Sequence, residues 1–264
     1  MTTAEKLPPP PPRRPAHYHC GLVRADERIP ADDAAARAWL HHREEALVDL
    51  VWQVIAGLAP RRPVAIFDAG CGEGGALARF VELAAPAPLE LTGITLSQKQ
   101  GELATHYLPQ ATWLVGDMLA EPSLVARQFD VVVAIQSTEY VGASRLAEFM
   151  RRAAGWLTPP GLLVVVAGSW ARPLPPEAPL AQLVSRFYRA EISLTDHYRQ
   201  AASQAGLRSL AELDLGPATL NYWQVRRDRP ALRSSPGGLV EHVFYLALAN
   251  GQADYRLYAW SRER

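Results

Sequence analysis

Hydrophobic and polar residues follow two different patterns along this chain, helical spacing in some stretches and short continuous apolar runs in others. Between Asp33 and Leu58 the apolar residues recur at the spacing of one helix face, so a helix is predicted over Asp33–Leu58. Beyond it, short apolar runs follow one another with helical stretches between most of them. The runs predicted as strands are VAIFDAG, LELTGIT, ATWLVGD, FDVVVAI and GLLVVVAG, and the predicted helices between them cover Gly75–Ala84, Gln98–Tyr107 and 144–156. This alternation predicts a parallel sheet with helices on both faces.

The alternation of predicted strands and helices ends after Ser169. A proline-rich connection leads to a predicted helix over 180–189 and then to a second helix, which Ser193 or Thr195 could cap and which Gly206 would end. Two further strands are predicted at 207–215 and 254–262, with a helix over 238–250 between them.

The composition narrows the class of protein. Twenty-seven Lys and Arg residues balance 27 Asp and Glu residues, so the chain lacks the basic excess of a non-specific nucleic-acid binder. Cys20 and Cys71 lie far apart without metal-binding spacing, which favours a reduced, cytoplasmic protein. No apolar run is long enough for a membrane span, and LPPPPPRRP is typical of a disordered tail rather than a signal peptide. We expect this tail to cover residues 1–15.

The motif FDAGCGEGG follows a predicted strand and opens a predicted helix. Its glycines fit both the dinucleotide pattern G-x-G-x-x-G and the D-x-G-x-G-x-G pattern of S-adenosylmethionine enzymes. The flanking carboxylates of Asp68 and Glu73 would repel a pyrophosphate but suit a cationic sulfonium with an α-amino group. The motif therefore favours a methyl donor.

The ends of the next two strands support the same cofactor. A dinucleotide site needs a carboxylate after the second strand, and GITLS has none. The third strand ends in VGDM, which places Asp117 to accept a hydrogen bond from an exocyclic amine and Met118 to lie against the adenine. We therefore predict that S-adenosylmethionine binds here. The residues expected to contact it directly are Asp68, Gly70, Cys71, Gly72, Thr95, Leu96, Asp117, Met118 and Gln136.

Several segments resemble one branch of the class I methyltransferases, which includes cyclopropane-fatty-acid synthases, sterol side-chain methyltransferases and geranyl diphosphate C-methyltransferases. GITLSQKQ resembles the second-strand signature of the branch, and HYHCGL resembles its H-Y-x-x-G element. QSTEYV, LDLGPATLNYWQVR and DYRLYAWSR resemble segments of the geranyl diphosphate enzymes in particular, and the likeness extends over about residues 17–262.

This resemblance implies a Rossmann-like α/β fold whose mostly parallel sheet has seven strands, the last one antiparallel, with the active site at the carboxyl ends of the strands. It implies that Gln100 binds the ribose and that Tyr18 and Gly21 belong to a lid over the cofactor. We expect one methyltransferase domain at 16–264. Within it we expect an N-terminal lid at 16–60 and helical cap inserts at about 170–205 and 216–250.

The enzymes of this branch methylate carbon, usually that of an alkene, and leave a carbocation that loses a proton. Such chemistry needs aromatic faces and a base, and a diphosphate substrate also needs cationic or hydrogen-bonding groups. Mg²⁺ would suit a diphosphate, although no carboxylate cluster in the sequence shows ligand spacing. The candidate substrate-binding residues are His17, His19, Tyr188, His197, Tyr222, Trp223 and Arg226.

The candidate base is the point at which this chain departs from its relatives. Gln136 stands where the geranyl diphosphate enzymes have their catalytic Glu, and an amide accepts no proton at neutral pH. Glu139 matches the Glu that supports a bicarbonate base in the cyclopropane synthases. We therefore expect Glu139 to be the base or to hold one, with Tyr140 stacking or hydrogen bonding beside it. Gln136 would contact the methionine end of the cofactor or orient the alkene.

Two substrate classes stay open for this fold. The first is an isoprenoid diphosphate such as isopentenyl or geranyl diphosphate, and the second is a non-phosphorylated lipid, terpenoid or other small natural product. A non-catalytic binding module would conflict with the intact cofactor motifs and with Glu139. The sequence leaves open the prenyl chain length and the formation of a homo-oligomer.

Overall fold

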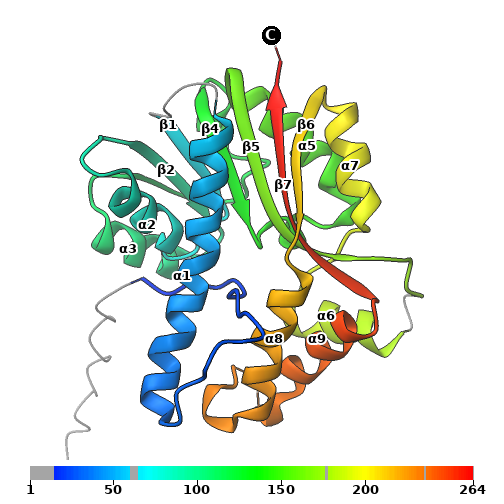
Figure 1. Ribbon diagram of the computed structural model, residues 1–264. Coiled ribbons are helices and arrows are strands. Elements are labelled where there is room, and N and C mark those ends of the chain that lie inside the picture. Colours follow the sequence, from blue (N-terminus) through cyan, green and yellow to red (C-terminus); the bar gives the residue numbers. More distant parts are fainter. Residues whose placement is uncertain (1–14, 60–64, 176–177, 235, 264) are drawn as a thin grey trace, which may run out of the picture.

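The computed structural model describes residues 15–59, 65–175, 178–234 and 236–263 (Figure 1). Within them lies a seven-stranded sheet with the order β3-β2-β1-β4-β5-β7-β6. The strands are β1 Ala65–Ala69, β2 Glu90–Thr95, β3 Thr112–Val115, β4 Phe129–Ile135, β5 Leu157–Trp170, β6 Leu207–Asp214 and β7 Ala253–Arg262. β1 to β5 pair in parallel, and β7 pairs antiparallel with both β5 and β6. The predicted Rossmann-like class I fold is confirmed.

The central strand β4 shows why this sheet is buried on both faces. Val131 and Val133 belong to one hydrophobic cluster, and Val132 and Ala134 between them belong to the other. Successive side chains of a strand point to opposite faces, so a continuous apolar run fills both layers of the core.

Helices cover both faces of the sheet. The first cluster joins the sheet to α1 and α2, and the second joins it to α5 and α7. The helices of these layers are α1 Asp33–Leu58, α2 Gly75–Ala84, α3 Gln98–Tyr107, α5 Leu146–Trp156 and α7 Thr195–Gln204. The bounds predicted for α1, α2 and α3 agree with the structure.

Three helices lie below the carboxyl ends of β4 and β5 (Figure 1). They are α6 Pro179–Tyr188, α8 Gly216–Asp228 and α9 Leu239–Ala249, and short helical turns join the remaining elements. These turns are η1 Pro122–Leu124, α4 Thr138–Val141, η2 Ala143–Arg145, η3 Pro230–Leu232 and η4 Pro236–Gly238.

The division into a lid, a domain and two cap inserts stays a prediction. Residues 1–14 of the expected tail lie outside the described residues. Within the insert expected at about 170–205, α7 packs on the sheet layer with α5 rather than beside α8. The N-terminal segment (residues 15–32) crosses from α2 towards α8, where Val23 N donates a hydrogen bond to Ala218 O.

The predicted cap of α7 is wrong. The residue before the helix is Leu194, and no side chain caps it. Thr195 Oγ1 instead donates to Asp254 Oδ2 at 2.6 Å and ties the helix to β7.

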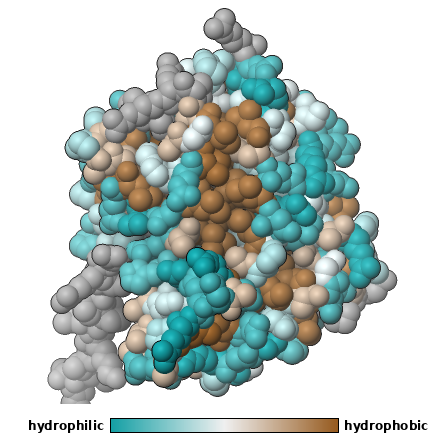
Figure 2. Space-filling model, viewed as in Figure 1, coloured by the Kyte–Doolittle hydropathy of each residue, from teal (hydrophilic) through white to brown (hydrophobic). Residues whose placement is uncertain are grey.

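Figure 2 shows hydrophobic side chains gathered in the middle of one face, beside α1 and over the adjoining part of the sheet. Polar residues surround them. None of the described helices is both long enough and apolar enough to cross a lipid bilayer.

Candidate active site

The glycine turn after β1 requires glycine by its geometry. Gly70 has φ +104°, and a Cβ there would lie 2.3 Å from the Cβ of Ser137. Gly72 has φ +54°, in the left-handed region that favours glycine. The backbone N–H groups of Gly70 and Cys71 both donate to Ile94 O, at 3.0 and 2.8 Å, which fixes the turn to β2. The turn therefore brings bare backbone and the start of α2 to the carboxyl edge of the sheet.

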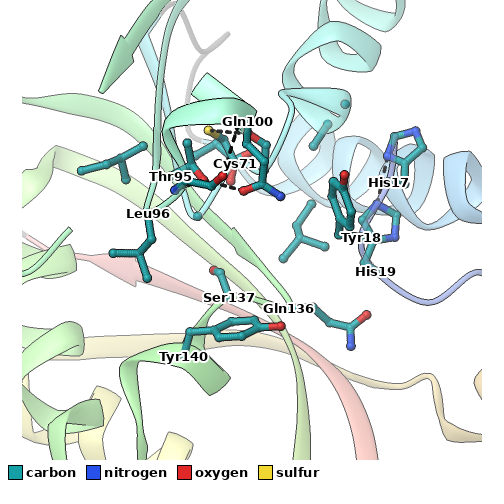
Figure 3. A pocket seen from close by; sticks show the side chains of 18 of the residues that line it. His17, Tyr18, His19, Cys71, Thr95, Leu96, Gln100, Gln136, Ser137 and Tyr140 are labelled. Carbon is teal, nitrogen blue, oxygen red and sulfur yellow. Dashed lines mark hydrogen bonds between the residues drawn. The ribbon is translucent and has the colours of Figure 1, made fainter. Parts of the chain in front are cut away.

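A first cavity of about 370 Å³ opens against this turn (Figure 3). Figure 3 shows Cys71, Thr95 and Gln100 on one side of it, Tyr18 beside His17 and His19 on another, and Ser137 and Tyr140 along the β4 side. The predicted cofactor residues that line it are Tyr18, Asp68, Gly70, Cys71, Gly72, Thr95, Leu96, Gln100, Met118 and Gln136.

Asp68 supplies a buried negative group to this cavity. Its side chain lies at the end of β1, and burial raises the pKa of its carboxyl to about 7. A cationic ligand beside it would lower that pKa again, because an opposite charge favours the ionised form. The glycine cradle and this carboxylate together fit the sulfonium and α-amino charges of S-adenosylmethionine.

Glu73 has a different role from the one expected. It does not line the cavity but accepts hydrogen bonds from Tyr18 Oη at 2.5 Å and from Ala16 N at 3.1 Å. Burial, followed by the hydrogen bond with Glu73, raises the pKa of Tyr18 to about 12. Glu73 therefore holds the N-terminal segment over the glycine turn, where the Tyr18 ring lies 3.2 Å from the position of a Gly72 Cβ.

Gln100 is oriented towards the cavity by its neighbour on β2. Thr95 Oγ1 donates to Gln100 Oε1 at 2.8 Å, and the Gln100 Nε2 atom lies 4.0 Å from the position of a Gly72 Cβ. An amide N–H in this position can donate to a ribose hydroxyl.

Two predicted cofactor residues, Gly21 and Asp117, do not line the first cavity. A Cβ on Gly21 would meet Arg43 C at 2.8 Å and Tyr222 Cδ2 at 2.9 Å, so Gly21 allows the N-terminal segment to pack closely between α1 and α8. Asp117 accepts hydrogen bonds from Leu119 N and Arg145 Nη1, at 2.9 and 3.0 Å, although Gly116 and Met118 on either side of it line the cavity.

A second cavity of about 390 Å³ lies on the other side of Gln136. It shares the walls formed by His17, Tyr18, His19, Gln136 and Tyr140 with the first cavity. The aromatic and aliphatic residues that complete it are Tyr222, Trp223, Phe244, Val184, Ala190 and Ile192. Because the two cavities adjoin, ligands bound in them would meet at Gln136 and Tyr140.

Glu139 places a carboxyl group in the second cavity. It is the second residue of the short helix α4 and is 7% exposed, and its Oε1 accepts a hydrogen bond from Gly168 N at 2.8 Å. Thr138, which precedes it, is hydrogen bonded through Oγ1 to Tyr198 Oη at 2.8 Å. Burial raises the pKa of Glu139 to about 7. Glu139 is therefore held rigidly, with a proton affinity suited to a base near neutral pH.

Gln136 adopts a backbone conformation that is rare for a residue with a side chain. Its φ is +47°, and its Oε1 accepts a hydrogen bond from Cys20 N at 2.5 Å. Such strain persists only where the surroundings hold the residue in place. Gln136 therefore joins the end of β4 to the N-terminal segment at the point where the two cavities meet.

Arg226 is the cationic side chain of the second cavity. It lies over the rings of Tyr222 and Trp223, with its Cζ 5.4 and 6.0 Å from their centroids. Glu44 and Glu241 pair with it at 3.7 and 4.0 Å. The two carboxylates therefore offset the guanidinium charge.

The remaining predicted substrate residues separate into two groups. His17 and His19 line both cavities, and burial lowers the pKa of each, that of His17 to about 3. His197 lies exposed on α7 and lines neither cavity, and the side chain of Tyr188 is outside the described part of the chain.

Sequence reasoning missed two kinds of lining residue. Ser97 and Gly116 line the first cavity, and they come two residues after β2 and one residue after β3. Their place at the carboxyl ends of strands is a signal that could have found them. Glu44 lines the second cavity from α1, where the apolar spacing of the helix gave no indication of a site.

Comparison with known proteins finds similarity to methyltransferases. Residues 66–161 match the family described as "Methyltransferase domain". A geranyl diphosphate 2-C-methyltransferase from Saccharopolyspora erythraea is 25% identical over 93% of this chain and 85% of its own length.

Two solved structures have the same fold over nearly the whole chain. A geranyl diphosphate methyltransferase in complex with S-adenosylmethionine has a TM-score of 0.78 and 25% identity, over 93% of this chain and 98% of that one. The geranyl diphosphate C-methyltransferase of Streptomyces coelicolor A3(2), in complex with Mg²⁺, geranyl diphosphate and S-adenosyl-L-homocysteine, has a TM-score of 0.78 and 24% identity, over 94% of this chain and 92% of that one.

Proposed function

We propose that this class I, S-adenosylmethionine-dependent methyltransferase, which resembles the geranyl diphosphate C-methyltransferases, methylates an alkene carbon of an isoprenoid diphosphate. The observation that carries the proposal is the carboxyl group of Glu139 in an aromatic cavity next to the cofactor cavity. A methyltransferase acting on oxygen or nitrogen has no need of a carbocation site, whereas alkene methylation needs both aromatic faces and a base.

The rings of the second cavity suit a cationic intermediate. Trp223 stacks on Phe244 with centroids 5.0 Å apart, and Tyr222 meets Trp223 edge to face at 5.4 Å. Aromatic faces attract a desolvated cation, by about 2 kcal/mol or more in a buried site. The aliphatic wall keeps water away from a carbocation that would otherwise be hydrated.

Proton removal is assigned to Glu139. S-adenosylmethionine supplies an electrophilic methyl group when it is bound. The π electrons of the alkene form the new C–C bond, the C–S bond breaks, and the positive charge falls on the neighbouring carbon. Glu139 then accepts a proton from a carbon adjacent to the cation, and the C–H electrons restore a double bond. Its pKa of about 7 leaves part of the carboxyl ionised at neutral pH.

Gln136 holds the N-terminal segment in position and does not transfer a proton. Its amide has no proton affinity at neutral pH, and its Oε1 atom is occupied by the hydrogen bond from Cys20 N. We infer that Gln136 keeps the N-terminal segment closed over both cavities during methyl transfer. Tyr140, which also lines both cavities, completes the wall between methyl donor and alkene.

The substrate class is tested with a panel of prenyl diphosphates of five to fifteen carbons, each incubated with S-adenosylmethionine. We expect a product heavier by one methyl group from at least one of them, detected by mass spectrometry. The corresponding prenyl alcohols form a second arm. Turnover of an alcohol but of no diphosphate would favour the non-phosphorylated substrate class, and no turnover in either arm would overturn the proposal.

The base is tested with Glu139→Gln, which keeps the size and the Oε1 acceptor of the side chain. We expect turnover to fall at least about 100-fold while the affinity for S-adenosylmethionine changes less than about threefold. Glu102→Gln on the exposed face of α3 is the matched control. Near-normal turnover of Glu139→Gln would rule out Glu139 as the base.

A further inference from the structure

Three side chains that the proposed mechanism does not use come together beside the two cavities. His17, His41 and Glu45 each offer one nitrogen or oxygen atom, and these atoms all lie within 4.8 Å of one another. The imidazole rings of His17 and His41 have centroids 5.1 Å apart. His17 comes from the N-terminal segment, whereas His41 and Glu45 lie one turn apart on α1. Residues of such different origin meet only in the folded chain.

Hydrogen bonds determine which nitrogen of His17 is available. His19 Nδ1 lies 3.0 Å from Cys20 O, a pure acceptor, so His19 donates from Nδ1 and its Nε2 carries a lone pair. His17 Nδ1 lies 3.2 Å from that Nε2 and must donate to it. The lone pair of His17 is therefore on Nε2. A histidine that binds a metal ion through one nitrogen almost always donates from the other in this way.

The carboxylate is supported in a similar manner. His42 Nδ1 lies 2.8 Å from Glu45 Oε2, and His41 Nε2 lies 3.5 Å from Glu45 Oε1. The Glu45 side chain is 12% exposed. Nearby, Arg79 forms hydrogen bonds with Asp49 and Glu82, which offset its positive charge. The cluster can therefore accept a cation.

The donor atoms indicate the kind of metal. Two imidazole nitrogens and one carboxylate oxygen suit Zn²⁺ and related transition-metal ions, whereas Mg²⁺ prefers oxygen ligands alone. Three protein ligands also leave coordination positions open for an exogenous ligand.

The second cavity gives such an ion a role. Its charged side chains include the Arg226 guanidinium and the carboxyl groups of Glu44 and Glu139, and Glu241 also pairs with Arg226. A diphosphate would therefore meet little net positive charge. His17 belongs to the wall of this cavity, so an ion held there would lie at its margin.

We propose that His17, His41 and Glu45 bind one divalent transition-metal ion of the Zn²⁺, Mn²⁺, Fe²⁺ and Co²⁺ class, and that an open coordination position takes a phosphate oxygen of the substrate. The second part rests on the proposed function, whereas the first part does not.

The test uses the full-length protein stripped of metal with a chelator, in the absence of S-adenosylmethionine and prenyl substrate. Calorimetric titration with Zn²⁺ should give one site, and Co²⁺ should give a visible ligand-field spectrum. His41→Ala and Glu45→Gln should each weaken Zn²⁺ binding at least about tenfold. His197→Ala, which changes an exposed histidine outside both cavities, should leave binding unchanged.

The outcomes separate this proposal from the proposed function. Equal Zn²⁺ affinity of wild type, His41→Ala and Glu45→Gln, each checked for folding by circular dichroism, would overturn the site. Tight binding of Mg²⁺ without Zn²⁺ binding would overturn the metal class. Inorganic pyrophosphate should bind the Zn²⁺-loaded protein more tightly than the stripped protein, and equal affinity would overturn the role of the open position. A protein that transfers methyl groups without binding Zn²⁺ refutes only this inference.

Discussion

At the scale of single residues, the burial of Glu139 sets the pH dependence of turnover. The carboxyl group must be ionised to accept a proton, and its pKa is raised to about 7. We predict that kcat rises about tenfold per pH unit below pH 7 and levels off above it. The measurement uses saturating S-adenosylmethionine, because Asp68 in the cofactor cavity also has its pKa raised to about 7. A profile without an inflection near pH 7 would contradict the assignment.

The same residue affects stability in a pH-dependent way. Because its pKa in the folded protein is about 7, against 4.5 for an ordinary Glu, the folded state favours the protonated carboxyl. That contribution is fully present below pH 4.5 and is lost as the pH rises through about 7. The Gln side chain cannot ionise. We therefore predict that the free energy of unfolding of Glu139→Gln exceeds that of wild type by on the order of 2–3 kcal/mol at pH 8 and equals it at pH 4.

This gain is read as the difference in Tm between variant and wild type at the two pH values. Glu102→Gln, an exposed substitution, is the control and should show no pH-dependent difference. A variant less stable than wild type at pH 8 would show that hydrogen bonds to the ionised carboxylate outweigh its desolvation.

At the scale of elements, the N-terminal segment is held over the cofactor cavity by few contacts. Tyr18 is 62% exposed, yet its hydroxyl donates to Glu73 and its ring covers Gly72. We predict that Tyr18→Phe, which removes only the hydroxyl, weakens S-adenosylmethionine binding about three- to tenfold, the equivalent of one net hydrogen bond of about 1 kcal/mol. Calorimetry measures the affinity. Unchanged affinity would mean that the segment closes without this bond.

The elements also show how far the sequence was predictive. The strand Phe129–Ile135 follows directly from its apolar run, and the helix Gln98–Tyr107 follows from its place between two predicted strands; both have the predicted bounds. A helical insert was expected at about 216–250, but the bounds of helix α8 were not predicted, because its opening Gly216 and Pro217 are typical of a turn, although proline is well tolerated in the first turn of a helix. Strand β5 begins at Leu157, four residues before the predicted start, because Leu157 already pairs with Phe129 of β4, ahead of an irregularity in the pairing before Leu162.

The site was predictable where it depends on the ends of strands. Backbone position alone brings Asp68, Gln136 and Glu139 to one edge of the sheet. The direction of a side chain depends on tertiary partners that the sequence does not reveal. Asp117 accordingly faces Arg145 instead of the cavity, and Gly21 serves helix packing.

At the scale of the whole molecule, the two cavities share a wall that includes Tyr18, His19 and Gln136, and this predicts coupled binding. A ligand in the first cavity must hold the N-terminal segment in place. The segment then loses less conformational entropy when the second ligand binds. We predict that S-adenosyl-L-homocysteine tightens the binding of a non-reactive prenyl diphosphate analogue at least about fivefold.

Thermodynamic linkage makes this coupling testable from both directions. The analogue must tighten S-adenosyl-L-homocysteine binding by the same factor, which calorimetry with each ligand in turn can check. Gln136→Ala removes the hydrogen bond that joins the end of β4 to the N-terminal segment at Cys20 N, and should bring the factor close to one. Independent binding in wild type would contradict a shared closing segment. In that case ligand binding in one cavity would not affect ligand binding in the other, and only the transferred methyl group would pass between them.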